Sequence, residues 1–241
     1  MHDELKRRVL DANLALVRHG LVVMTWGNAS AIDRNKGVVA IKASGVPYDR
    51  MTVADIAVVD LDGRPLEGRI RPSSDLATHL ALYHAWPALG GVVHTHSTYA
   101  TMHAQACRPV PCLGTTHADH FHGPVPVTRV LTEREAADDY EGNTGELIVE
   151  CFAGLDPLHV PAVLVAAHGP FAWGAGVEAA VANAVALEQV ARLALGTLQI
   201  NPDAPALPPH LLEKHFRRKH GPHAYYGQRP AATGGTAAKQ T

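Results

Sequence analysis

The sequence lacks several features that would assign it to a particular class of protein. Its 241 residues carry a formal net charge of only −2, so there is no basic field to attract nucleic acid or an anionic membrane. No stretch reaches the roughly 18 apolar residues that a membrane-spanning helix needs. The charged beginning, MHDELKRRVL, has no apolar segment typical of a signal peptide. We therefore expect a cytoplasmic protein with neither nucleic acid nor membrane as partner.

Cysteine is also scarce. There are three, Cys107, Cys112 and Cys151, and no two form a Cys-x-x-Cys pair. An odd number of scattered cysteines is typical of free thiols in a reducing cytoplasm rather than of a disulfide framework. The length and the hydrophobic content of 46% fit one globular α/β domain. Histidine, in contrast, is abundant, with 16 residues. Because imidazole is both a metal ligand and an acid/base at neutral pH, the spacing of these histidines is informative.

Helical and extended segments alternate along the chain, which predicts helices packed around one sheet. The spacing of apolar residues predicts helices over 3–19, 74–86, 97–106, 176–198 and 211–220. Short apolar runs predict strands over 38–42, 56–61, 91–95, 125–127 and 162–167. The last residues, 229–241, have the small and polar composition of a disordered tail.

Two histidines, His94 and His96, lie two residues apart at the end of a predicted strand. A strand has a period of two, so both imidazoles should point to the same face. His168 follows another apolar strand, and Asp75 opens a predicted helix. Three histidines and one oxygen ligand suit Zn²⁺ or a similar ion, although histidines at strand ends can also serve only as hydrogen-bonding caps. A second cluster, HADHFH at 117–122, is interpreted as site lining, with a further metal site as the alternative.

Three loops carry small residues that are rich in hydrogen-bond donors. They contain Gly27 and Asn28 in TWGNAS, Ser44 and Gly45 in KASG, and Ser73 and Ser74 in RPSSD. The serine pair precedes a helix, whose free N–H groups and dipole favour an anion, and Lys42 would add positive charge. Each fragment alone is equally typical of an ordinary helix cap or turn. Together, beside a metal site, they predict a phosphate pocket.

These segments, with GGVVHTHS, GTTHAD, HGPFAWG and the tail LLEKHFRRKHGPHAYYGQ, resemble the class II aldolase/adducin-type family. Within it they are most similar to the bacterial L-ribulose-5-phosphate 4-epimerases. The resemblance runs from residue 3 to Gln228 and implies one domain over residues 1–228. The implied fold is an α/β sandwich with a central, largely antiparallel sheet flanked by helices. Related aldolases carry a glutamate base where Asp75 stands, so this aspartate favours the epimerases.

The resemblance also implies roles for individual residues, in a homotetramer whose sites lie between subunits. The ligands of Zn²⁺, or of Mn²⁺ or Co²⁺, would be Asp75, His94, His96 and His168. The phosphate group of a ketopentose substrate would be held by Gly27, Asn28, Lys42, Ser44, Gly45, Ser73 and Ser74. Asp119 and Tyr226 would be the acid/base pair, and Thr116 and His215 would line the site. Tyr226 and His215 would come from the neighbouring subunit. His120 and His122 stand where related epimerases carry tyrosines, which leaves the substrate preference open.

The implied reaction interconverts L-ribulose 5-phosphate and D-xylulose 5-phosphate. The hydrogen on C4 is not acidic, because C4 is not next to the carbonyl. Cleavage of the C3–C4 bond, rotation of the aldehyde fragment and re-addition would invert C4 without removing that hydrogen, and a metal would stabilise the enediolate. The alternatives are an aldolase of the fuculose-phosphate type, a sugar-phosphate dehydratase, and a non-catalytic adducin-like module. The module is disfavoured because all three metal histidines are present.

Overall fold

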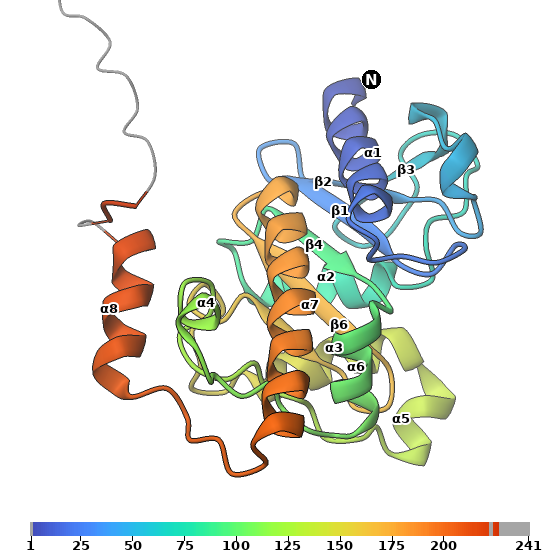
Figure 1. Cartoon of the computed structure of the whole chain (residues 1–241). Helices are drawn as coiled ribbons and strands as arrows, with labels where there is room; N and C mark the ends of the chain where they lie inside the picture. The colour runs from blue at the N-terminus through green and yellow to red at the C-terminus, as the bar shows by residue number, and fades with distance from the viewer. Residues whose placement is uncertain (1, 222–223, 227–241) are drawn as a thin grey trace, which may run out of the picture.

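Six short strands form one sheet in the order β3-β2-β1-β4-β6-β5 in the computed structural model, which describes residues 2–221 and 224–226 (Figure 1). The strands are β1 Asn28–Asp33, β2 Val38–Lys42, β3 Ile56–Asp60, β4 Gly91–His94, β5 Ala162–Leu164 and β6 Pro170–Gly174. Each pair of neighbours in the sheet is antiparallel. Nearly every strand residue is buried, so both faces of the sheet are covered. The predicted antiparallel α/β sandwich is confirmed.

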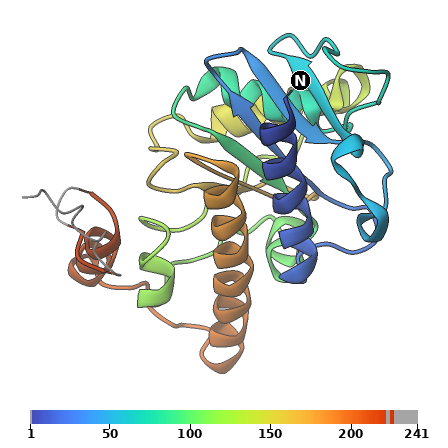
Figure 2. The ribbon, with the colours of Figure 1, turned by 90° about the horizontal axis from the view of Figure 1, so that it is seen from above.

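Helices pack on both faces of this sheet. Their bounds are α1 Asp3–Arg18, α2 Leu76–Ala85, α3 Thr98–Gln105, α4 Thr115–Ala118, α5 Glu133–Asp138, α6 Tyr140–Cys151, α7 Val177–Ile200 and α8 Pro209–Lys219. Short 3₁₀ turns span Tyr48–Arg50 and Val53–Asp55. Figure 2 shows α1, α3 and α7 on one face and α2 and α6 on the other. The core between these layers includes Trp173, Tyr83, Phe171 and Leu82, all fully buried.

Helix α8 stands to one side of the sandwich and contacts α4 (Figure 1). The predicted disordered tail, 229–241, lies outside the described residues. Within the described part of the chain, no helix combines the length and the apolar content that a membrane crossing requires.

The structure corrects two predicted strands. Residues 125–127 form only isolated bridges, from Val125 to Val110 and from Val127 to Leu164. The strand predicted over 162–167 ends at Leu164, because the chain turns back into β6 and Ala167 adopts a positive φ of 61°. The sequence pattern did not predict β1, β6 or α6. Two glycines interrupt the helical pattern of α6, and Pro170 opens β6.

Candidate active site

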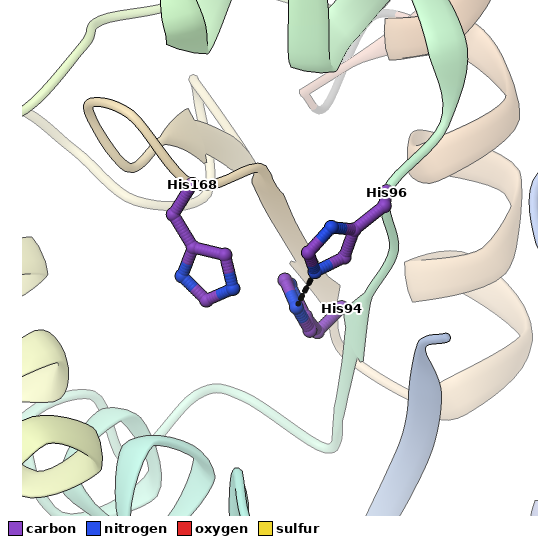
Figure 3. A group of neighbouring side chains, drawn as sticks. All are labelled: His94, His96 and His168. Carbon is purple, nitrogen blue, oxygen red and sulfur yellow. Dashed lines mark hydrogen bonds between the residues drawn. The ribbon is translucent and has the colours of Figure 1, made fainter. Parts of the chain in front are cut away.

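Three imidazoles converge where β4 ends and the chain turns from β5 into β6 (Figure 3). Antiparallel pairing of His94 with Phe171 brings this turn, which carries His168, beside the end of β4. His94, His96 and His168 each offer one ring nitrogen within 4.8 Å of the others. The Nε2 atoms of His94 and His96 are 3.1 Å apart. The structure therefore brings together the three histidines that the sequence singled out.

The surroundings of these rings suit metal ligands. The Nδ1–H of His94 donates to the carbonyl oxygen of Pro170 at 3.0 Å, which leaves the Nε2 lone pair facing the other imidazoles. The Nδ1 of His168 lies 3.3 Å from the hydroxyl of Tyr140. Burial lowers the pKa of His94 and His96, and it lowers that of His168 to about 3. All three rings are therefore neutral at physiological pH, and neutral, oriented imidazole is the form that binds a divalent ion.

A carboxylate lies beside the three rings. Asp75 is the N-cap residue of α2, and its Oδ2 accepts hydrogen bonds from Asn28 Nδ2 at 2.6 Å and Ser73 Oγ at 3.5 Å. Burial alone would raise the pKa of Asp75, but the nearby histidines and Asn28 outweigh burial and hold it below its ordinary value. Its Oδ1 has no hydrogen-bond partner among the described residues. Asp75 lines the same pocket as the histidines but falls outside the group of ligand atoms that lie within 4.8 Å of one another.

The histidines open into a pocket of ≈ 410 Å³. All seven predicted phosphate residues line it, together with Asp75 and the three histidines: Gly27, Asn28, Lys42, Ser44, Gly45, Ser73 and Ser74. Gly27 has a φ of +105°, and a Cβ there would lie 2.8 Å from the carbonyl oxygen of His94. Only glycine therefore lets this loop approach the end of β4 so closely.

Lys42 is the cation of this pocket. Its side chain is 2% exposed, and its Nζ donates one hydrogen bond, to the carbonyl oxygen of Ala43 at 3.3 Å. It has no carboxylate partner among the described residues. Burial lowers the pKa of Lys42, which measures the cost of keeping this charge away from water. A buried, uncompensated ammonium group that faces a pocket favours an anionic ligand.

The pocket is also lined by two residues that the sequence patterns did not single out. Tyr140 and Glu141 form the first turn of α6 and bring this helix to the wall of the pocket. One residue in the sequence could have indicated the start of α6. It is Asp139, whose side chain caps the helix by accepting a hydrogen bond from the Gly142 N–H. An aspartate before a helix is a common start signal, but the glycines inside α6 obscured it.

The other predicted site residues lie elsewhere. Asp119, at the end of α4, accepts a two-pronged hydrogen bond from the Arg218 guanidinium and another from His215 Nδ1 at 3.1 Å. Burial would raise the pKa of Asp119, but these donors outweigh burial and lower it. The ring of Tyr226 lies 5.0 Å from the Arg218 guanidinium carbon. These residues form a second group, the α8 cluster, which is defined as Asp119, His215, Arg218 and Tyr226.

None of the α8 cluster lines the histidine pocket. Thr116 lies in a separate pocket of ≈ 170 Å³ between α4 and α7. The alternative metal site within 117–122 is not formed, since the only metal-ligand group among the described residues is that of the three histidines described above. His117 instead bonds to the carbonyl oxygen of Gly123 at 2.7 Å, and His122 to Glu213 at 2.8 Å.

Known proteins resemble this chain both in sequence and in structure. The family model for the class II aldolase and adducin N-terminal domain matches residues 7–195. The chain is 57% identical over 227 residues to the L-ribulose-5-phosphate 4-epimerase UlaF of Salmonella paratyphi A, covering 94% of this chain and 100% of that relative. A solved L-fuculose 1-phosphate aldolase aligns with a TM-score of 0.75 and 26% identity over 88% of this chain and 94% of its own. The corresponding enzyme from Thermus thermophilus aligns with a TM-score of 0.64 and 25% identity over 84% and 98%.

Proposed function

The chain belongs to the class II aldolase and adducin family, and we propose that it is a metal-dependent epimerase that interconverts L-ribulose 5-phosphate and D-xylulose 5-phosphate. One observation carries this proposal. A single pocket combines three neutral imidazoles at one end with an uncompensated buried lysine and donor-rich loops at the other. A phosphorylated ketopentose has the matching pair of groups, vicinal oxygens for a cation and a phosphate for the lysine. The 57% identity to an epimerase supports this choice over the aldolases, which share the fold at 26%.

The group that His94, His96, His168 and Asp75 would hold is a divalent ion. Zn²⁺ suits three imidazoles and a carboxylate best, and Mn²⁺ or Co²⁺ would also fit. When bound, such an ion supplies Lewis-acid stabilisation of the negative charge that develops on the ketose oxygens as the C3–C4 bond breaks. The residues of the chain bind, orient and exchange protons with the substrate around it.

The phosphate pocket accounts for epimerisation rather than simple cleavage. In a pentulose 5-phosphate, the phosphate belongs to the aldehyde fragment, glycolaldehyde phosphate. Lys42, Asn28 and the loops around Ser44 and Ser73 would hold that phosphate throughout the reaction. The aldehyde carbon can then rotate and present its opposite face while the fragment stays bound. Retention of this fragment is what separates an epimerase from an aldolase with the same fold.

Two proton-transfer groups are needed, one on each face of the aldehyde. We propose Asp119 and Tyr226 for these roles, with His215 and Thr116 lining the site. Asp119 and Tyr226 both contact Arg218 in one chain, outside that chain's own histidine pocket. We propose that they enter the pocket of an adjacent subunit together. Asp119 would then come from the neighbouring subunit, as expected for Tyr226 and His215. A cyclic homotetramer provides such head-to-tail interfaces.

The test is an assay of purified, metal-loaded protein with L-ribulose 5-phosphate. We expect D-xylulose 5-phosphate to form, followed by NMR or by a coupled enzyme that uses the product. Release of free aldehyde would instead identify an aldolase, and a diketone product would identify a dehydratase. No turnover by protein with a bound metal ion would overturn the proposal. The cysteines are free thiols, which supports our further proposal that the enzyme works in the cytoplasm.

A further inference from the structure

A row of polar side chains runs between α2 and β1, from the pocket into the core. Asp75, His79 and Tyr83 are four residues apart and share one face of the α2 segment, while Asn28 and Ser30 share one face of β1. Four residues of helix rise about 6 Å and two residues of strand about 6.6 Å. The side chains on α2 and on β1 are therefore spaced by similar distances. Asn28 contacts Asp75, and Ser30 contacts His79 and Tyr83.

The inner part of this row is fully buried. Ser30 Oγ lies 2.7 Å from His79 Nδ1 and 2.8 Å from Tyr83 Oη, and the three side chains are 0%, 0% and 1% exposed. One arrangement of protons gives both hydroxyl hydrogens an acceptor: Tyr83 donates to Ser30, and Ser30 donates to His79 Nδ1. With the proton on His79 Nδ1 instead, one buried hydroxyl hydrogen would lack an acceptor and the Nε2 lone pair would lack a donor, so two groups rather than one would be unmet. His79 Nδ1 is therefore an acceptor, and the ring carries its proton on Nε2.

This Nε2–H has no hydrogen-bond partner among the described residues. Burial lowers the pKa of His79 to about 3, so the ring is neutral and Nε2 is its single donor. The charge of Asp75, one helical turn away, acts directly on this ring, and Asp75 Oδ1 has no donor of its own. His79 Nε2–H is thus an unmet buried donor one helical turn from Asp75, which lines the pocket.

His79 also supports the histidines through an aromatic contact. Its ring meets Phe171 edge-on, with centroids 6.1 Å apart, and Phe171 stacks on His94 at 4.2 Å. A change in the orientation of His79 would therefore reach both Asp75 and His94.

We propose that His79 is a positioning residue of the metal pocket. Held in one tautomer by Ser30 and Tyr83, it would donate its Nε2–H to Asp75 Oδ1 when the ion is bound, a bond that the structure does not contain, and would keep that carboxylate turned toward the three histidines. A carboxylate oxygen has two lone pairs, so Oδ1 can accept this bond and still face the ion. The inference rests on the metal site of the proposed function, but it assigns a role to residues that touch neither metal nor substrate.

The test measures metal affinity, which does not depend on turnover. Metal-free protein is titrated with Co²⁺ and Zn²⁺ against a chromophoric chelator, and the visible spectrum of the Co²⁺ form reports its coordination. We expect His79→Leu to weaken binding about 10–100-fold, as is typical when a residue that orients a ligand is lost. His79→Gln should restore much of this affinity, because its amide N–H can take the place of Nε2–H. Tyr83→Phe should shift both the affinity and the spectrum in the direction of His79→Leu.

The matched control is Thr144→Val, which also removes a buried hydroxyl, but one bonded to the carbonyl oxygen of Tyr140 within α6. It should leave the affinity unchanged. If wild-type protein binds no metal, the proposed metal site fails. If wild type binds and folded His79→Leu binds within twofold of it, the inference about His79 fails. Should His79→Leu not fold, Tyr83→Phe decides, and unchanged affinity and spectrum there would overturn the inference.

Discussion

Lys42 is a buried cation without a carboxylate partner among the described residues, held against the ring of Tyr48 with its Nζ 5.0 Å from the ring centroid. The folding of the rest of the chain has already offset the desolvation of this ammonium group, so a phosphate that binds it does not have to displace a full hydration shell from the lysine. Such a site binds anions more tightly than a lysine on the surface does.

We therefore expect Lys42→Met to raise the KM for L-ribulose 5-phosphate by roughly 10–100-fold, the equivalent of about 1.5–3 kcal/mol for a hydrogen bond to a charged group. The matched control is Lys36→Met, which removes an exposed lysine paired with Asp33. Steady-state kinetics of both variants provide the measurement. A KM for Lys42→Met equal to that of the control would mean that the phosphate binds elsewhere.

Individual site residues differed in how far local patterns could predict them. His94 and His96 were predicted from the period of a strand, and their rings do meet, although β4 ends at His94 and His96 follows it. His168 required the hairpin between β5 and β6, which local patterns do not reveal. The grouping of Asp119 with Tyr226 depends on α8 folding back onto α4, in a contact between Asp119 and Arg218 that spans 99 residues of chain. Their suggested roles came from the family resemblance, because neither lies in a motif whose chemistry can be derived from spacing.

At the scale of elements, helices and strands with a regular apolar face could be predicted from the sequence, whereas a strand that carries polar site residues could not. Helices α1 and α7 have apolar faces that pack on the sheet, and their spacing was clear. Strand β1 has the sequence NASAID, and two of its inward side chains, Asn28 and Ser30, are polar because they face the polar row on α2. The strand therefore lacks the usual apolar alternation. Local patterns fail here because the segment serves the site.

Helix α3 closely follows His96, a residue of the proposed metal site, and a side chain of α7 fixes the start of this helix. It begins two residues after His96, and its N-cap Ser97 makes no capping bond with its side chain. Glu188 of α7 replaces that cap: its carboxylate accepts from the Tyr99 N–H at 2.9 Å and the Ala100 N–H at 3.0 Å. A carboxylate at a helix N-terminus satisfies free N–H groups and complements the dipole.

We expect Glu188→Ala to lower the free energy of unfolding by about 1–2 kcal/mol, the range for loss of a helix cap. The control is Glu178→Ala, in the same helix, which removes an exposed pair with Arg8 and should cost about 0–1 kcal/mol. Urea unfolding of the metal-free proteins measures both. Equal losses in the two variants would show that the contact with α3 adds nothing beyond a surface ion pair.

At the scale of the whole molecule, the functional groups are divided between two places. The histidine pocket lies at the end of β4 and the start of β1, the two central strands of the sheet. Helix α8, which carries His215 and Arg218 of the α8 cluster, stands at the side of the sandwich (Figure 1). Tyr226 is 62% exposed, although its proposed role requires a substrate in a dry site. Both facts follow if the pocket of one subunit is completed by the α8 cluster of the next, as in a closed ring.

This division predicts that two inactive variants will restore activity to each other. His96→Asn should disable the pocket but leave α8 intact, and Tyr226→Phe should do the reverse. In hybrid rings assembled from equal amounts, a site is intact when a Tyr226→Phe subunit supplies the pocket and a His96→Asn subunit supplies α8. Random assembly gives about one quarter of sites this pairing, so we expect roughly a quarter of the wild-type kcat per subunit.

The measurement uses differently tagged chains that are unfolded together, refolded with metal and purified through both tags, so that only hybrids are assayed. Each variant refolded alone is the control and should remain inactive. If pocket and α8 cluster instead served the same chain, every hybrid site would contain one of the two substitutions. Verified hybrids without activity would therefore refute the shared site. Recovery near one quarter would assign the pocket and the acid/base pair of each site to different subunits.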